Sequence, residues 1–261
     1  MADAPQRLDQ ALVDRGLARS RSQAQQRIEA GLVTVHGRPA LKASLKVAPD
    51  ASLEIAGDDA WVSRAAHKLL AALDAFAIDP SGRVALDAGA STGGFTQVLL
   101  ARGAAHVTAL DVGHGQFQPQ PDARIRLVEG VNVRDLAPGD VDPAPSLVTA
   151  DLSFISLGLA LPPLVGAAEP GADLVVLVKP QFEVGRTGVR EGIVTNPALR
   201  ALAIERVLFA AWDAGLGTAG LIASPIAGAR GNAEYLAHLT AGAANPTEWL
   251  GEAARLAKEE R

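Results

Sequence analysis

Between residues 84 and 214, short apolar runs alternate with segments whose apolar residues are spaced as in amphipathic helices. Residues 95–102 and 197–214 are predicted to form helices. Strands that alternate with helices at this spacing predict an α/β fold, in which a parallel sheet is covered by helices on both faces. Ligands of such sheets bind outside the carboxyl ends of the strands, so the chemistry is expected there. The apolar runs with the length and composition of buried strands are residues 84–87, 107–112, 125–128, 147–150 and 174–178.

The first 55 residues have a different pattern, which predicts a small α+β domain. Leucine and alanine residues between positions 8 and 17 have helical spacing. Ser20 and Ser22 each precede a glutamine by three residues, which is a capping signal for a second helix. That helix is expected to end before Gly31, because glycine is favoured just after a C-cap.

Beyond these helices, residues 33–35 and 53–55 are predicted to form short strands. The first strand is followed by a turn at His36-Gly37, where histidine tolerates a positive φ. A polar joint, AGDDAWVS, then separates this region from the apolar runs. We therefore expect a first domain, a linker and a second domain at residues 1–58, 59–63 and 64–261.

The charge of the chain is unevenly distributed. The 261 residues have a formal net charge of −5, but the segment from Arg7 to Lys46 contains eight cationic and three acidic residues. Its net charge of +5 indicates a basic arm for nucleic acid on an acidic body. A solvated helix face would carry the same charge, so this alternative stays open.

The composition excludes several classes of protein. The chain has no cysteine, so it has neither disulfide bonds nor a thiolate zinc site. It contains no run of about 18 apolar residues, which a membrane helix needs. The first ten residues, MADAPQRLDQ, lack the apolar region of a secretory signal. A cytoplasmic enzyme is therefore expected.

A glycine-rich turn, DAGASTGGFT, follows the first predicted strand and opens a helix. Its G-x-x-x-G-G spacing matches neither the dinucleotide fingerprint nor the phosphate-binding loop, and no lysine follows it. Asp87 instead supplies a carboxylate that suits the amino group of a zwitterion. Asp111, at the end of the second strand, suits ribose hydroxyls. This combination favours S-adenosylmethionine, although a structural turn would explain the glycines taken alone.

Two charged residues directly follow very apolar runs: Asp151 in TADLSF and Lys179 in LVKPQF. Charged residues are rare at buried positions unless they are paired or functional. We therefore interpret the two residues as part of a reacting site. The alternative is a salt bridge that stabilises the edge of the sheet.

Several longer segments resemble the TlyA family, rRNA methyltransferases that are also named hemolysins. The stretches RLDQALVDRGLARSRSQA and IEAGLVTVHG resemble the RNA-binding module named after ribosomal protein S four. The resemblance implies a Rossmann-like class I methyltransferase of the FtsJ-like type, with a mostly parallel seven-stranded sheet after a small α+β RNA-binding domain. The segments that carry it in the second domain are WVSRAAHKL, DAGASTGGFT, TADLSFISL, LVKPQFEVGR and SPIAGARGNAEY.

The resemblance also implies a Lys-Asp-Lys-Glu catalytic tetrad, which corresponds here to Lys68, Asp151, Lys179 and Glu234. Burial and a neighbouring cation favour the neutral form of a lysine amine. We therefore expect Lys179 to act as the base toward a ribose 2′-OH or as the group that orients this hydroxyl, with Lys68 as the neighbouring cation. The two carboxylates are expected to orient the amines, and no metal is required. Without the resemblance, Lys68, Glu234 and His67 would all be interpreted as surface residues.

The same resemblance assigns residues that bind the cofactor and RNA. Arginine suits phosphate because its planar group donates two parallel hydrogen bonds. Cofactor contacts are expected from Asp87, Gly89, Ala90, Ser91, Thr92, Gly93, Gly94, Phe95, Asp111, Val112, Asn132 and Asp151. RNA contacts are expected from Arg7, Arg19, Ser20, Arg21, Lys42 and Arg64.

The chain departs from the family at two places. After Asp111 the family has a glycine–aromatic–glycine stretch, whereas residues 113–119 here are GHGQFQP, with Gln118-Pro119 where a tryptophan is common. The wall near the adenine, or the substrate loop, is therefore expected to differ. The joint before the second domain reads DAWV instead of beginning with arginine, which affects any coupling through the linker.

Three hypotheses of function follow. The first is S-adenosylmethionine-dependent 2′-O-methylation of rRNA, with ribosomal subunits as partners and cytidine as the nucleotide that the resemblance implies. The second is an inactive RNA-binding or ribosome-assembly protein, against which the intact tetrad and glycine turn argue. The third is a membrane-active hemolysin, which lacks support because no segment is long and apolar enough to span a bilayer and no helix is strongly amphipathic with a basic face.

Overall fold

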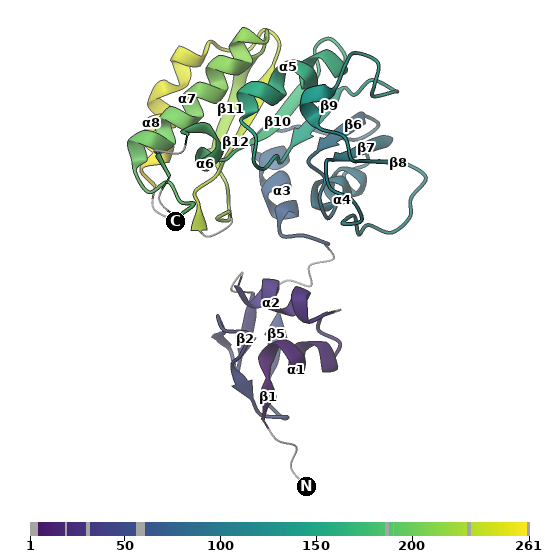
Figure 1. The fold of residues 1–261 in the computed structure, drawn as a ribbon, viewed down its shortest axis with the longest axis vertical. Coiled ribbons are helices and arrows are strands. Elements are labelled where there is room, and N and C mark those ends of the chain that lie inside the picture. Colours follow the sequence, from purple (N-terminus) through teal and green to yellow (C-terminus); the bar gives the residue numbers. More distant parts are fainter. Residues whose placement is uncertain are drawn as a thin grey trace. The chain divides into compact units, whose positions relative to one another are not determined.

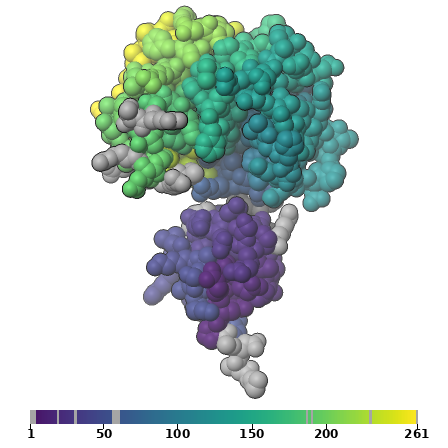
Figure 2. Space-filling view, viewed as in Figure 1, coloured from purple at the N-terminus to yellow at the C-terminus, as the bar shows by residue number. Residues whose placement is uncertain are grey.

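The periodic apolar pattern is realised in a computed structural model that describes residues 5–18, 20–29, 32–55, 61–185, 188–189, 191–228 and 231–259. The chain divides into two units, residues 1–60 and residues 61–261. The first unit is drawn in purple to blue and the second in blue to yellow (Figure 1, Figure 2).

In the first unit, two helices pack on short antiparallel strands. The helices are α1 (Leu8–Asp14) and α2 (Arg21–Glu29). Their side chains Leu8, Leu12 and Ile28 are buried in one apolar cluster with the strands. The expected small α+β domain is thus confirmed. Its strands are β1 (Gln6–Arg7) paired with β4 (Lys46–Val47), and β2 (Val33–Val35) paired with β3 (Arg38–Pro39) and β5 (Leu53–Ile55).

The predicted turn and the predicted helix cap of this unit can both be compared with the structure. His36 and Gly37 have φ values of 51° and 73°, the combination found in a tight hairpin turn, so the expected positive φ at histidine is confirmed. The Ser20 Oγ accepts a hydrogen bond of 3.2 Å from the Gln23 backbone N–H, which caps the start of α2. Gly31, which was expected to end α2, lies outside the described residues.

The described part of the second unit contains a seven-stranded sheet in the order β11-β12-β10-β9-β6-β7-β8. Strands β8, β7, β6, β9 and β10 are parallel, whereas β12 is antiparallel to both of its neighbours. The expected mostly parallel seven-stranded sheet is therefore confirmed, and the five strands predicted from apolar runs agree with β6 to β10 within one residue. The strands are β6 (Val84–Ala88), β7 (His106–Asp111), β8 (Ile125–Glu129), β9 (Leu147–Ala150), β10 (Asp173–Val178), β11 (Gly217–Ala223) and β12 (Tyr235–Thr240).

Helices cover both faces of this sheet (Figure 1). Helices α3 (Ala65–Ala75) and α4 (Gly94–Ala101) pack on one face. The other face is covered by α5 (Leu157–Ala167), α7 (Pro197–Asp213) and α8 (Leu250–Ala257). The predicted helices at 95–102 and 197–214 correspond to α4 and α7. Shorter helical segments are η1 (Val133–Asp135), α6 (Pro180–Glu183) and η4 (Pro246–Trp249).

Strand β10 shows why the sheet is covered on both sides. Leu174, Val176 and Val178 are buried beneath the helices of one face, and Val175 and Leu177 beneath those of the other. Side chains alternate between the two faces of a strand, so a continuous apolar run buries both.

Candidate active site

Several strand ends meet at the carboxyl edge of the sheet. Asp151 follows β9 and Lys179 follows β10, which is the adjacent parallel strand. Because β12 is antiparallel, its first residue lies at this same edge. Val178 pairs with Tyr235, so the register brings Glu234 next to Lys179. The strand order therefore arranges Asp151, Lys179 and Glu234 side by side.

The four residues of the predicted tetrad form two ion pairs. Lys179 Nζ lies 2.7 Å from Asp151 Oδ1, and Lys68 Nζ lies 2.5 Å from Glu234 Oε2. Lys68 lies on the buried face of α3 and not on the protein surface. The Lys68–Glu234 pair is almost completely buried and the Lys179–Asp151 pair is largely buried, so each charge depends on its partner. The structure thus brings the four residues together, and their catalytic roles stay predictions.

The segment before β12 is shaped around Glu234. A Cβ atom on Gly228 would overlap the Glu234 carboxylate, so a glycine is required there. Asn232 is buried, accepts a hydrogen bond from the Val194 backbone N–H and donates one to the Gly192 carbonyl. The glycines and the asparagine of SPIAGARGNAEY therefore have structural reasons for their positions.

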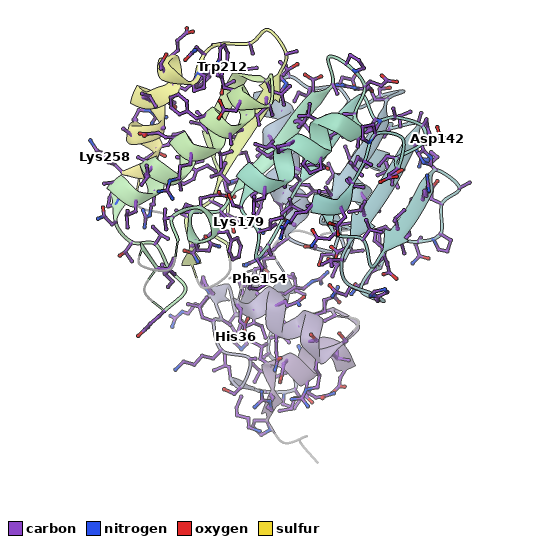
Figure 3. All side chains as sticks on the ribbon, turned by 45° about the horizontal axis from the view of Figure 1, so that its top comes forward. His36, Asp142, Phe154, Lys179, Trp212 and Lys258 are labelled. Atoms are coloured by element: carbon purple, nitrogen blue, oxygen red, sulfur yellow. The ribbon has the colours of Figure 1, made fainter. Side chains whose placement is uncertain are left out.

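Two residues of the site were missed by sequence reasoning. Lys179 Nζ donates a 2.9 Å hydrogen bond to Ser153 Oγ, two residues after Asp151. Phe154 follows with a positive φ of 65° and a side chain that is 92% exposed. Phe154 and Lys179 are labelled in Figure 3. The Phe154 ring lies 5.3 Å from that of Phe182, which belongs to the short helix after Lys179. The only available signal was the position of both residues directly after a strand-end acid.

A cleft of about 640 Å³ opens at the ends of β6 and β7. Asp111 lies on its wall, and its two carboxylate oxygens accept hydrogen bonds of 2.8 and 2.7 Å from the backbone N–H groups of Ser91 and Gly113. The Oδ1 atom of Asn132 caps η1 by accepting from the Arg134 backbone N–H. The predicted cofactor residues that line this cleft are Gly89, Ser91, Asp111, Val112, Asn132 and Asp151.

A smaller pocket of about 150 Å³ adjoins the cleft. The two cavities share Gly89, Ser91, Asp151 and Ser153 as wall residues, and Lys179 lines the smaller one. The Lys179–Asp151 pair therefore lies where the cavities meet. The predicted cofactor residues that line the smaller pocket are Gly89, Ala90, Ser91, Thr92, Gly94, Phe95 and Asp151.

Asp87 was expected at the cofactor's amino group, and this role stays a prediction. Its side chain is completely buried and lines neither cavity. The alternation along β6 turns it beneath the start of α4, where the Thr96 hydroxyl donates a 2.6 Å hydrogen bond to Oδ2. Burial, assisted by the negative charge of Asp151, raises the pKa of Asp87 to about 7. Asp87 therefore supports the glycine turn from inside.

The departure at residues 113–119 packs on the glycine turn. Gly93 precedes α4 with a φ of 89° and lines neither cavity, because Pro119 covers it. A Cβ atom on Gly93 would lie 2.5 Å from the Pro119 ring. Gln116, from the same stretch, lines the larger cleft. The altered sequence thus contributes directly to the wall of the candidate site.

The residues predicted to bind RNA in the first unit are partly used within that unit. Arg7 and Arg21 both pair with Asp9, which is fully buried, at 2.9 and 3.1 Å. The two guanidinium groups hold the pKa of Asp9 well below its ordinary value, with the Arg7 hydrogen bonds as the main cause. The arginine side chains remain 39% and 54% exposed. Each therefore presents a positioned, partly accessible cation.

Other predicted RNA contacts and cations are distributed differently. Lys42 and Arg64 are exposed. Arg19 lies outside the described residues, and Ser20 caps α2 with its hydroxyl. Arg15, by contrast, donates to the backbone carbonyls of Ala48, Pro49 and Ala51. Part of the positive charge of this segment therefore lies on side chains that also stabilise the fold of the first unit.

Comparison with known families divides the chain in the same order as its fold. Residues 6–53 match the S4 domain, and residues 61–241 match the FtsJ-like methyltransferases. The second match covers more than half of the chain. In the described part of the chain, the helices are all too short or too polar to cross a membrane.

Individual proteins are similar over most of their length. TlyA of Mycobacterium tuberculosis, named a 16S/23S rRNA (cytidine-2′-O)-methyltransferase, is 52% identical over 88% of this chain and 87% of its own. Hemolysin A of Brachyspira hyodysenteriae is 38% identical over 89% of this chain and 98% of its own. A solved structure described as a hemolysin from Streptococcus thermophilus has a TM-score of 0.77 and 37% identity, over 98% of this chain and 96% of that one. The chain therefore belongs to the TlyA family, with an S4 domain before an FtsJ-like methyltransferase domain.

Proposed function

We propose that this protein transfers the methyl group of S-adenosylmethionine to the ribose 2′-OH of a cytidine in rRNA. The observation that carries the proposal is the buried Lys179–Asp151 pair, which lies where a large cleft meets a small pocket. The name of the M. tuberculosis relative, which is 52% identical, supports rRNA cytidine as the acceptor.

The larger cleft suits the adenosine part of the cofactor. Asp111 is fixed by two backbone N–H groups and retains lone pairs for ribose hydroxyls. Leu110, Val131 and Ile155 provide apolar wall for a base. The volume of about 640 Å³ is within the range of small-molecule sites. When bound, the cofactor supplies a methyl group on a positively charged sulfur.

Lys179 is the residue best placed to accept the proton of the 2′-OH. A neutral amine has two N–H bonds and one lone pair. Ser153 Oγ accepts one hydrogen bond from Nζ at 2.9 Å, and Asp151 Oδ1 lies 2.7 Å from Nζ as its ion-pair partner. The lone pair is then free to face the pocket that Lys179 lines. In that orientation, the amine accepts the proton as the ribose oxygen attacks the methyl group.

Lys68 and Glu234 support this arrangement from the neighbouring strand position. Their pair lines neither the cleft nor the small pocket in the described residues, so neither side chain is placed to touch the methyl donor. The strand register places Glu234 beside Lys179, so the Lys68–Glu234 pair adjoins the Lys179–Asp151 pair. Glu234 keeps Lys68 buried and oriented at 2.5 Å.

Two further features suit RNA as the acceptor. The exposed Phe154 ring offers a face on which an unpaired base can stack. In the first unit, Asp9 holds Arg7 and Arg21 in fixed positions, which lowers the entropic cost of binding phosphate.

The proposal is tested by methylation of purified rRNA and ribosomal subunits with labelled S-adenosylmethionine, followed by mass spectrometry of the product nucleosides. The wild-type protein should yield 2′-O-methylcytidine. Lys179→Ala should be slower by about 10²–10⁴-fold with an unchanged cofactor Kd, because a positioned base contributes that much to the rate. Lys179→Arg should restore little, since a guanidinium stays protonated.

Thermal melting of the variants separates loss of chemistry from loss of fold. A folded Lys179→Ala protein that methylates rRNA at the wild-type rate would overturn the assignment of Lys179. A folded wild-type protein that binds RNA without methylating it would favour the inactive RNA-binding alternative.

A further inference from the structure

A third cavity, of about 370 Å³, lies at the same edge of the sheet on the side of β11 and β12. Its wall includes Glu234, Tyr235, Arg200 from α7, and Leu256 and Glu259 from the C-terminal helical segment. None of these residues lines the cofactor cleft or the small pocket. The cavity therefore flanks the tetrad on the side opposite the cofactor cleft in the strand order.

The hydroxyl of Tyr235 is the first sign that this cavity receives a ligand. The residue is only 1% exposed, and its Oη has no hydrogen-bond partner within the part of the chain that the structure describes. A buried hydroxyl without a partner destabilises a folded protein. Buried polar groups without a partner are uncommon in native proteins, so the hydroxyl calls for an explanation beyond packing.

The balance of charge in the cavity is the second sign. Glu234 pairs with Lys68 at 2.5 Å, and Glu259 pairs at 2.5 Å with Arg255, which also pairs with Glu252 at 2.6 Å. Arg200 donates from Nε to the Val194 carbonyl at 2.8 Å and has no carboxylate partner among the described residues. Its terminal N–H groups are therefore available to an anion.

The position of the cavity along the sheet edge indicates which anion it binds. Lys179, at the acceptor pocket, lies next to Glu234 in the β10–β12 register, and Glu234 lines this cavity. An RNA strand whose 2′-OH faces Lys179 continues past Glu234 if it follows the sheet edge. The next nucleotide along such a strand brings a phosphate and a base to the cavity.

We propose that this cavity binds the nucleotide adjacent to the methylated one, and that Arg200 and the Tyr235 hydroxyl hold the phosphate of that nucleotide. This proposal rests on the proposed function. The apolar walls at Ile226 and Leu256 accommodate its base or sugar. The site adds a second recognition element that is independent of the methyl donor.

Tyr235→Phe tests the hydroxyl alone, because it preserves the ring. The melting temperature should stay equal or rise, since an unpaired buried hydroxyl is removed. The KM for the rRNA substrate should increase by about tenfold, with the cofactor Kd unchanged, because a hydrogen bond to a charged group is lost.

Arg200→Gln tests the cation. The matched control is Arg102→Gln, just after α4, where Arg102 pairs with Asp74. Arg200→Gln should weaken binding of a single-stranded oligoribonucleotide to the full-length protein, measured by fluorescence anisotropy. It should also reduce the slope of log K against log salt by about one. Arg102→Gln should change neither quantity.

A stable Tyr235→Phe protein with wild-type KM, together with unchanged RNA binding by Arg200→Gln, would overturn the site. These binding measurements do not depend on turnover. If the wild-type protein failed to methylate rRNA, the proposed function would fail while the RNA contact could still be scored.

Discussion

The amine of Lys179 has two fixed neighbours, Asp151 Oδ1 and Ser153 Oγ. If both are needed to direct its lone pair, Ser153→Ala should lower the plateau of the pH–rate profile by about 10- to 100-fold, since misorientation is costly. Ser153→Thr, which keeps the hydroxyl at an exposed position, should recover most of the rate. Single-turnover methylation across pH measures this. A plateau unchanged by the alanine variant would remove Ser153 from the site.

Asp87 provides a pH-dependent prediction. Its pKa of about 7 in the folded protein exceeds the reference value for aspartate of about 3.9. Between these values the folded state binds more protons than the unfolded state, so Asp87 lowers the free energy of unfolding as pH rises from about 4 to about 7. Asp87→Asn cannot ionise, so its melting temperature should fall less over this range.

Melting curves at several pH values check the Asp87 prediction. The cofactor Kd serves as the control and should change little, because Asp87 lines neither cavity. Parallel pH dependences for the two proteins would show that Asp87 does not titrate in this range.

Single residues also show where sequence reasoning reaches its limit. The strand-end positions of Asp151 and Lys179 were predictable, because an apolar run followed by a charge marks a sheet edge. The direction of Asp87 was not, since a shift of one residue along a strand reverses the face of the sheet. The use of Arg7 and Arg21 around Asp9 depends on contacts across two elements, which spacing alone does not reveal.

At the scale of elements, the Lys68–Glu234 pair connects α3 to the start of β12. Lys68→Met should cost about 3–5 kcal/mol, because it leaves the Glu234 carboxylate buried without a partner. The double variant Lys68→Met/Glu234→Leu should recover much of that loss, since no isolated charge remains. Denaturant unfolding of the single and double variants measures both effects.

An exposed ion pair provides the comparison. Arg102 and Asp74 lie 2.7 Å apart with side chains 38% and 61% exposed. Replacing Arg102 by Gln should cost less than about 1 kcal/mol. Equal losses in the free energy of unfolding for Lys68→Met and Arg102→Gln would contradict the importance assigned to burial.

The strands differed in how well their sequence predicted them. Strands β6, β7, β9 and β10 were found because their mostly apolar residues are buried on both faces, whereas β8 is an edge strand whose residues are half-buried or exposed. Strand β11, GTAGLIA, contains two glycines, and its first one approaches Ala243 so closely that a Cβ atom would overlap the backbone. Packing of that kind weakens the apolar signal, so β11, like β12, was expected from the family resemblance alone.

At the scale of the whole molecule, the two units are expected to contribute separable functions. Removal of residues 1–60 should weaken rRNA binding and flatten its salt dependence, because fewer phosphate contacts release fewer counterions. The cofactor Kd of residues 61–261 should be retained, since the residues that line the cleft all lie in that unit. Salt titrations and calorimetry test these two outcomes. An unchanged salt slope would assign the first unit to another partner.

The antiparallel direction of β12 has a consequence for how such an enzyme changes its target. The residues proposed to face the methyl donor follow parallel strands, whereas Glu234 lies at the end of the connection between β11 and β12. If the cavity beside Glu234 binds RNA as proposed, substitutions in that connection are expected to change which nucleotide is methylated while the donor site stays intact. Evolution of new specificities in proteins of this architecture is expected to concentrate on one hairpin.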